Sequence, residues 1–293
     1  MADDDTHRFG TDLLQVAVKA AGAEPVSLRT AAGHELLWQA GPEWPRHAPM
    51  LFPIVGRLAG DTLRHHGQPS RMTQHGFARD RRFDWLERGP AGCRLALADD
   101  AQSRAIYPFG FRLEVEYRVE AARLAIEYRL VNTGNAVLPA SLGAHPGFRW
   151  PLADGVAKTA HRLVFERPEP APIRRVEGGL LREAPEPSPV DGRVLALDEA
   201  LFADDAVILD CPQSRSMVFE GDGAPVALEI GWHGMDQLGI WSKPGAKFLC
   251  IEPWNGLASP VGFDGEFTDK PFLMRLDPGA EARLGWSVAV LAR

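Results

Sequence analysis

Two neighbouring stretches of strict alternation between apolar and polar residues constrain the fold more than any other feature of this 293-residue sequence. The apolar members of the first stretch are Phe111, Leu113, Val115, Tyr117 and Val119. Those of the second stretch are Leu124, Ile126, Tyr128 and Leu130. Because successive side chains of a strand point to opposite faces, this period of two predicts an antiparallel hairpin with one buried and one solvated face. The turn residues Thr133–Asn135 then reverse the chain into a strand over Val137–Leu142, so that His145 follows just past a strand end.

The rest of the chain carries many short strand patterns and little sign of helix. The strand patterns lie at Leu13–Lys19, Val26–Thr30, Glu35–Gln39, Arg94–Ala98, Val207–Asp210, Met217–Glu220, Val226–Ile230, Gln237–Trp241, Lys247–Glu252 and Ala282–Val290. Only Asp99–Ile106 predicts a helix, which Pro108 ends. Many short strands between frequent turns favour a sandwich or barrel over a βαβ enzyme. We therefore expect an all-β fold, a large antiparallel β-sandwich with few short helices, as a single domain over residues 1–293.

A proline-rich stretch, residues 151–194, interrupts these patterns. Its composition is compatible with a linker between domains, but strand patterns of one kind lie on both sides of it. We expect long loops on a single sandwich instead, and we expect them to form one rim of a cleft.

Composition argues against several classes of partner. The net charge of −7 and the pI near 5.7 argue against nucleic-acid binding, which needs a basic face. No apolar run is long enough to cross a bilayer, and Met1–Asp5 is acidic where a secretory signal is basic and then apolar. Cys93, Cys211 and Cys250 are an odd set without redox or metal spacing, so we expect three free thiols. These features predict a cytoplasmic protein, a monomer or homodimer, with no nucleic-acid or membrane partner.

Three short segments, far apart in the sequence, combine ionisable residues with glycine, proline and aromatic neighbours. They are His75–Arg79 (His-Gly-Phe-Ala-Arg), Gly143–Phe148 (Gly-Ala-His-Pro-Gly-Phe) and Ile251–Gly256 (Ile-Glu-Pro-Trp-Asn-Gly). Glycine and proline place these ionisable groups on loops or at strand ends. A carboxylate that accepts a proton, an imidazole that donates one and aromatic faces that stack on a sugar together indicate acid–base chemistry on a carbohydrate.

Other kinds of site have weaker support. Two histidines and a carboxylate can form a facial triad for iron, but such triads on β scaffolds usually keep two ligands close, as in His-x-His, and that spacing does not occur. Cys-x-x-Cys, His-Glu-x-x-His, a nucleophile elbow, a phosphate loop and a dinucleotide fingerprint are also missing from the sequence. A glycosidase needs two carboxylates, and only Glu252 has a suitable context. We therefore expect neither a metal nor a cofactor.

The same segments resemble the aldose 1-epimerase (mutarotase) family, and most closely its bacterial galactose-mutarotase-related branch. The resemblance begins at Ala48–Leu58 (Ala-Pro-Met-Leu-Phe-Pro-Ile-Val-Gly-Arg-Leu), continues through His75–Asp80, Gly143–Phe148 and Ile251–Trp254, and reaches the strand near Trp286. Each motif alone is moderately specific, but four in the family's order cover nearly the whole chain. The resemblance implies a large antiparallel β-sandwich whose cleft binds one pyranose.

The resemblance also implies roles for individual residues. By it, Glu252 is the catalytic base, His145 the catalytic acid and His75 a second active-site histidine. The residues expected to bind the sugar are Arg57, Gln74, Arg79 and Asp205 or its neighbour Asp204. Apart from the resemblance, the aromatic residues Phe148 and Trp254 are candidates to cover an apolar face of the sugar, with an ordinary core position as the alternative for either. The galactose-specific branch has an asparagine after the arginine, where this chain has Leu58–Ala59, so galactose itself does not follow from the resemblance.

The expected reaction is interconversion of the α and β anomers of a free hexose. Ring opening takes a proton from the C1 hydroxyl and gives one to the ring oxygen, which an ionised Glu252 and a protonated His145 on opposite sides of the ring can do. One alternative is a mutarotase for a phosphorylated or other anionic hexose, since Gln74–Arg79 is similar to a run that contributes to sugar-phosphate binding in hexose-6-phosphate mutarotases. The other is a non-catalytic sugar-binding protein, against which the matched acid and base argue.

Overall fold

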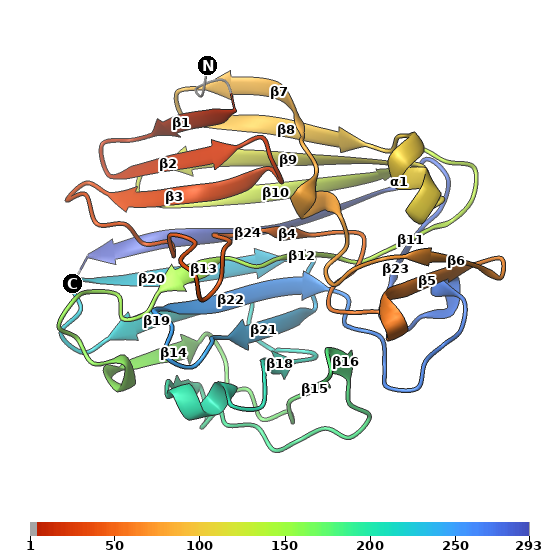
Figure 1. The fold of residues 1–293 in the computed structure, drawn as a ribbon. Helices are drawn as coiled ribbons and strands as arrows, with labels where there is room; N and C mark the ends of the chain where they lie inside the picture. Colours follow the sequence, from red (N-terminus) through yellow and green to blue (C-terminus); the bar gives the residue numbers. More distant parts are fainter. Residues whose placement is uncertain (1–4, 293) are drawn as a thin grey trace.

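The computed structural model describes residues 5–292, and within them the backbone is built from antiparallel strand pairs. These residues form a nine-stranded sheet, a six-stranded sheet, a three-stranded sheet and short two-stranded ribbons (Figure 1). The expected all-β antiparallel sandwich is therefore confirmed. No helix within residues 5–292 is long and apolar enough to span a membrane.

The nine-stranded sheet forms the back layer of the molecule in Figure 1. Its strands, in spatial order, are β17 (Val194–Ala196), β14 (His161–Phe165), β19 (Ser216–Gly221), β20 (Val226–His233), β24 (Glu281–Ala292), β10 (Arg123–Asn132), β9 (Phe111–Glu120), β8 (Gly92–Ala98) and β7 (Asp84–Gly89). The predicted hairpin is β9–β10, in which Leu124 lies opposite Val119 and Leu130 opposite Leu113. The apolar residues of this hairpin are buried, as the alternation requires.

The six-stranded sheet lies in front of the nine-stranded sheet and is buried on both of its faces. Its strands are β18 (Val207–Leu209), β21 (Gln237–Trp241), β22 (Phe248–Asn255), β12 (Leu142–Ala144) and β4 (Met50–Leu51), with β13 (Gly147–Arg149) also paired to β22. Along β22, Leu249 and Ile251 point into the main core, whereas Cys250 and Glu252 point to the opposite face. That opposite face is the floor of the cavity described below.

A three-stranded sheet, β1–β3, covers the upper part of the nine-stranded sheet (Figure 1). One hydrophobic cluster runs from Phe9 to Val288 and takes in side chains from all three sheets. The remaining strands are β1 (Thr6–Gly10), β2 (Leu14–Lys19), β3 (Glu24–Thr30), β5 (Thr62–His65), β6 (Gln68–Arg71), β11 (Leu138–Ala140), β15 (Val176–Glu177), β16 (Leu180–Leu181) and β23 (Met274–Leu276). The expected helix is α1 (Ala101–Ile106), and the short 3-10 helices are η1 (Ala59–Asp61), η2 (Ala78–Asp80), η3 (Lys158–Ala160), η4 (Glu199–Phe202) and η5 (Phe267–Asp269).

Two expectations about local structure need correction. The proline-rich stretch is not loop throughout, because it contributes β14 to the nine-stranded sheet and forms the β15–β16 ribbon. The expected strand over Glu35–Gln39 is reduced to isolated bridges, since Glu35 pairs with Arg29 and Leu37 with Phe148.

Candidate active site

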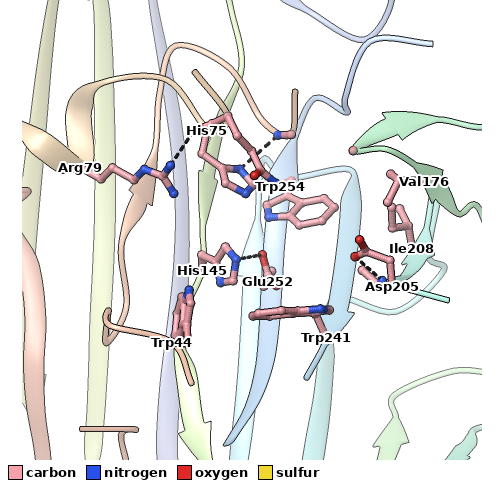
Figure 2. A pocket seen from close by; sticks show the side chains of 14 residues that line it. Trp44, His75, Arg79, His145, Val176, Asp205, Ile208, Trp241, Glu252 and Trp254 are labelled. Carbon is pink, nitrogen blue, oxygen red and sulfur yellow. Dashed lines mark hydrogen bonds and ion pairs between the residues drawn. The ribbon is translucent and has the colours of Figure 1, made fainter. Parts of the chain in front are cut away.

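A cavity of about 370 Å³ opens on the outer face of the six-stranded sheet (Figure 2). Seven of the residues selected from the sequence line it: Gln74, His75, Arg79, His145, Asp205, Glu252 and Trp254. They come from four separate parts of the chain, since the floor belongs to β22 and to the end of β12, and the walls belong to loops. The cavity volume is within the range of pockets that bind small molecules.

His145 and Glu252 form the centre of the cavity. Nε2 of His145 lies 3.3 Å from Oε2 of Glu252 (Figure 2), and both side chains are almost completely buried. Burial, and then the charge of Asp205, raise the pKa of Glu252 well above its usual value. Burial, followed by the charge of Arg79, lowers the pKa of His145 to about 3. Both shifts favour a resting pair in which the carboxyl group holds the proton and the imidazole is neutral.

Two buried polar atoms of this pair are without a hydrogen-bond partner among the described residues, namely Nδ1 of His145 and Oε2 of Glu252. Buried polar atoms are nearly always satisfied, so exceptions beside a cavity indicate where the polar groups of a ligand fit. The pair can therefore exchange protons with a hydroxyl-bearing molecule in the cavity.

His75 is the second imidazole of the cavity, with its ring centroid 5.5 Å from that of His145 and nearly perpendicular to it. The backbone of His75 has a φ of +66°, a strained conformation for a residue with a side chain. Its Nδ1 accepts a hydrogen bond from the amide of Gly56 at 3.1 Å, which leaves the proton on Nε2. Burial and the neighbouring His145 and Arg79 lower the pKa of His75 well below its usual value. His75 is therefore a neutral ring that can donate one hydrogen bond from Nε2.

Arg79 lies on one side of the cavity and Asp205 on the other (Figure 2). Nη2 of Arg79 donates to the carbonyl of Gln74 at 2.6 Å, whereas Nε is buried without a hydrogen-bond partner among the described residues and has only a contact of 3.9 Å with Asp80. Burial and the nearby Arg46 lower the pKa of Arg79 to about 10, so the guanidinium remains charged at neutral pH. The cavity thus presents a hydrogen-bond donor on one wall and an acceptor on the opposite wall.

Of the two adjacent aspartates, only Asp205 lines the cavity. The carboxylate of Asp204 is held by Arg182 through contacts of 2.8 and 2.9 Å, outside the cavity. Asp205 lines the cavity and has a φ of +63°. The buried Arg175 donates to the carbonyl of Asp205 at 2.8 Å and so anchors this strained residue.

Aromatic rings cover the apolar parts of the cavity. The indole of Trp254 fits between two glycines, because a Cβ at Gly143 or at Gly239 would lie only 2.5 or 2.3 Å from it. Trp44 stacks on the ring of His145, with centroids 4.9 Å apart and planes inclined by 26°. Trp241 meets the same imidazole edge-on at 5.9 Å. The sequence did not single out Trp44 or Trp241.

A signal for Trp241 was present in the sequence. Gln237, Gly239 and Trp241 alternate along a predicted strand, so Trp241 shares a face with the glycine beside the indole of Trp254. Trp44 stands in an irregular loop between Pro42 and Pro45, where no periodicity indicates its direction. The β15–β16 ribbon adds Val176 and Gly179 to the lining, so part of the proline-rich stretch does form a rim, as expected.

Two expected sugar-binding residues do not line the cavity. Phe148 is completely buried in the main core, because it alternates in β13 with Gly147, which faces Trp44 on the other side. Arg57 follows the cavity residue Gly56 but is not part of the lining; its Nε donates to Asp61 at 2.8 Å, and its side chain packs beside Gly178 and Gly179 at the β15–β16 rim.

The cysteines are free thiols, as expected, and one of them lies beside the acid–base pair. Cys250 is two residues from Glu252 on β22 and points to the same face. Within the described part of the chain, His145, Cys250 and Glu252 are the group whose arrangement could hold a metal ion.

Comparison with known proteins agrees with this architecture. A family model described as aldose 1-epimerase matches residues 5–275. The chain is 28% identical to the plasmid-encoded protein LacX of Lactococcus lactis subsp. lactis, over 98% of this chain and 99% of LacX.

Two solved structures share the whole fold. A galactose mutarotase related enzyme from Lactobacillus acidophilus superposes with a TM-score of 0.90 at 28% identity, covering 98% of this chain and 97% of the other. A galactose mutarotase-like protein from Lactobacillus casei has a TM-score of 0.90 at 26% identity, covering 98% and 100%. The match of the family model over nearly the whole chain, together with the buried histidine–glutamate pair in its cavity, places this protein in the aldose 1-epimerase family.

Proposed function

We propose that this protein is a mutarotase that interconverts the α and β anomers of a free hexose by general acid–base catalysis. The observation that carries the proposal is the contact of 3.3 Å between His145 and Glu252 inside a cavity of about 370 Å³. In this proposal Glu252 takes the proton of the C1 hydroxyl while His145 protonates the ring oxygen. The C1–O bond of the ring then breaks, the aldehyde rotates, and the reverse transfers close the ring on either face.

The short separation suits this reaction and favours an arrangement other than the acid and base on opposite sides of the ring that the sequence led us to expect. The two oxygens that exchange protons are both bonded to C1, so an acid and a base that serve them must lie close together. Direct contact between His145 and Glu252 supports placement of both groups on one side of the ring. A glycosidase instead keeps two carboxylates about 5 Å or more apart, so that a nucleophile or water reaches the far side of the sugar.

The protonation state that burial favours also differs from the ionised glutamate and the imidazolium expected from the sequence. Burial favours the uncharged pair, with the carboxyl protonated and His145 neutral. Both arrangements contain a single proton, and a transfer across the contact between the side chains converts one into the other. The sugar's hydroxyls would stabilise the charged arrangement by supplying hydrogen bonds in the cavity.

The other residues of the cavity support a role in holding the sugar. Asp205 is suited to accept from hydroxyls on one side, and Arg79 to donate on the other. His75 would donate from Nε2 to a sugar oxygen, since the Gly56 amide occupies its Nδ1. The faces of Trp254 and Trp241 are suited to the apolar C–H surface of a pyranose.

The test follows the optical rotation of freshly dissolved α-glucose and α-galactose, with and without the protein. We expect catalysed mutarotation, and we expect Glu252→Gln and His145→Asn each to reduce kcat by at least about 10². His75→Asn should cost less, because His75 orients the sugar and transfers no proton. His233→Asn is the matched control, since His233 pairs with Glu127 on the surface. A pure sugar-binding protein would bind sugars without changing the rate.

A second candidate, a mutarotase for an anionic hexose, is favoured by the positive charge on one side of the cavity. Arg46 lies close enough to Arg79 to lower its pKa, and guanidinium groups pair well with phosphate and carboxylate. Asp80 bonds Arg46 at 2.8 Å and offsets part of this charge. The experiment compares kcat/KM for glucose and glucose 6-phosphate. Neutral sugars are excluded as the preferred substrates if kcat/KM for glucose 6-phosphate exceeds that for glucose by tenfold or more and Arg79→Ala removes only this difference.

A further inference from the structure

Cys250 lies directly beside the acid–base pair, although the proposed reaction has no use for a thiol. One ligand atom each from His145, Cys250 and Glu252 can be chosen so that all three lie within 4.8 Å of one another. The three side chains are buried, and two of them also line the open cavity. A thiol, an imidazole and a carboxylate that converge in this way are the ligand types that zinc prefers.

The atoms needed for coordination are not occupied by other bonds. Among the described residues, Nδ1 of His145 has no hydrogen-bond partner, and Oε2 of Glu252 has only its 3.3 Å contact with Nε2 of His145, which lies within the proposed ligand set. Cys250 is a free thiol. With zinc–ligand bonds of about 2.0–2.3 Å, tetrahedral ligand atoms are roughly 3.6 Å apart. The widest spacing here is 4.8 Å or less, so moderate rotations of the side chains of His145 and Glu252 bring the three atoms to bonding distance.

The backbone favours the convergence of these three ligand atoms on one metal ion. Cys250 and Glu252 are alternate residues of one strand, so their side chains leave the same face of β22. That strand is fixed on both sides, with Gly147 of β13 and Trp241 of β21 both paired to Cys250. His145 reaches the same place from the chain just beyond β12. Two of the ligands are thus held by a rigid sheet, as stable metal sites require.

We propose that His145, Cys250 and Glu252 form a binding site for Zn²⁺ or a similar borderline-soft divalent cation, and that the cation inhibits the enzyme. A thiolate and a carboxylate balance the charge of the ion, so the buried centre is neutral once it is filled. Thiolate and imidazole ligands select zinc or cobalt over magnesium or calcium, which take oxygen ligands. The ion would occupy the atoms of both proposed catalytic residues, so it competes with the proton they share.

Binding is tested without reference to activity, with Co²⁺ as a spectroscopic substitute for zinc. Because Cys211 is an exposed thiol that could bind metal by itself, all proteins carry Cys211→Ser. In this background, one equivalent of Co²⁺ should give visible bands of tetrahedral cobalt and a near-ultraviolet thiolate-to-cobalt charge-transfer band. Zn²⁺ should displace the cobalt, and the loss of the cobalt bands during this titration gives the affinity of the protein for zinc.

The ligand set is tested with two buried cysteines. Cys250→Ala should remove the thiolate band and weaken zinc by at least about tenfold. Cys93→Ala is the matched control, because Cys93 is also a buried thiol but belongs to β8, far along the nine-stranded sheet. This substitution should leave the thiolate band and the zinc affinity unchanged. Circular dichroism and thermal unfolding check that both variants fold. The absence of a thiolate band, or a band that survives in Cys250→Ala, overturns the site.

The inhibitory consequence rests on the proposed mutarotase function and is measured separately. Zn²⁺ should slow mutarotation by the Cys211→Ser protein, with reversal by a chelator, and Cys250→Ala should resist the ion while it retains basal activity. Unchanged rates at zinc concentrations that saturate the cobalt-competition assay would refute inhibition. If the protein shows no mutarotation at all, the proposed function fails, whereas the spectroscopic result still decides the metal site.

Discussion

The contact between His145 and Glu252 predicts that their catalytic contributions are not independent. A positioned acid or base typically contributes roughly 10² to 10⁴ in rate, so each single substitution, Glu252→Gln or His145→Asn, should slow mutarotation by that factor. Independent groups would give a double variant slower by the product, roughly 10⁴ to 10⁸. In the proposed mechanism the two side chains, which lie 3.3 Å apart, share one proton, so loss of either partner already disables the transfer. The double variant should therefore be about as slow as the slower single variant.

The assay is polarimetry of α-glucose at saturating concentration, with the spontaneous rate subtracted and folding checked by thermal unfolding. Glu252→Gln keeps a side chain of the same size in a buried position, and His145→Asn puts a smaller polar side chain beside the open cavity, so the variants should fold. A double variant that loses activity by the product of the single effects would show that the two groups act separately. A single variant with a near-normal rate would remove that residue from the mechanism.

Three further predictions concern pH, an aromatic wall and a buried lysine. Burial lowers the pKa of His145 to about 3 and raises that of Glu252, so the pair gains a second proton only in acid and keeps its single proton to a higher pH than an ordinary carboxyl group would. The pH profile of kcat/KM should therefore show no decline with the pKa of an ordinary imidazolium, about 6.5. Trp44→Leu removes a ring stacked on His145 at 4.9 Å, worth about 0.5–1.5 kcal/mol, so kcat should fall roughly two- to tenfold while Trp44→Phe stays closer to wild type in the same assay. Lys270 is buried with a pKa lowered to about 7, so the unfolded chain binds more protons above that pH and the free energy of unfolding gains about 1.4 kcal/mol per pH unit toward pH 10. Urea unfolding of Lys270→Met across this range should lack that contribution, and equal slopes in both proteins would contradict it.

The strands that alternate most strictly were predictable from the sequence, because their alternation reports burial directly. The hairpin of β9 and β10 and the short helix α1 both appear where the sequence indicates them. Strand β14 was hidden by the prolines around it, and β7 is an edge strand whose side chains are mostly exposed, so little apolar alternation marks it. Glu35–Gln39 has a strand pattern but finds only isolated partners, which depend on contacts distant in the sequence.

The cavity was predictable to the extent that its residues belong to distinctive motifs. His75, His145 and Glu252 stand beside glycines and prolines that fix their backbones, and the structure brings all three together. Phe148 was misjudged because one step along a strand decides between the core and the cavity. The pKa shifts could not be foreseen either, since they arise from burial by residues that are far away in the sequence.

The cavity takes its floor and its walls from different kinds of structure, and this has an evolutionary consequence. The acid–base pair rests on a sheet packed on both faces, where a change of side chain disturbs the core. The walls around Trp44 and around the β15–β16 ribbon are surface connections, which accept substitutions and insertions at low cost in stability. Changes in the wall segments can thus alter which sugar fits the cavity, while the floor that holds the proposed proton-transfer pair stays unchanged.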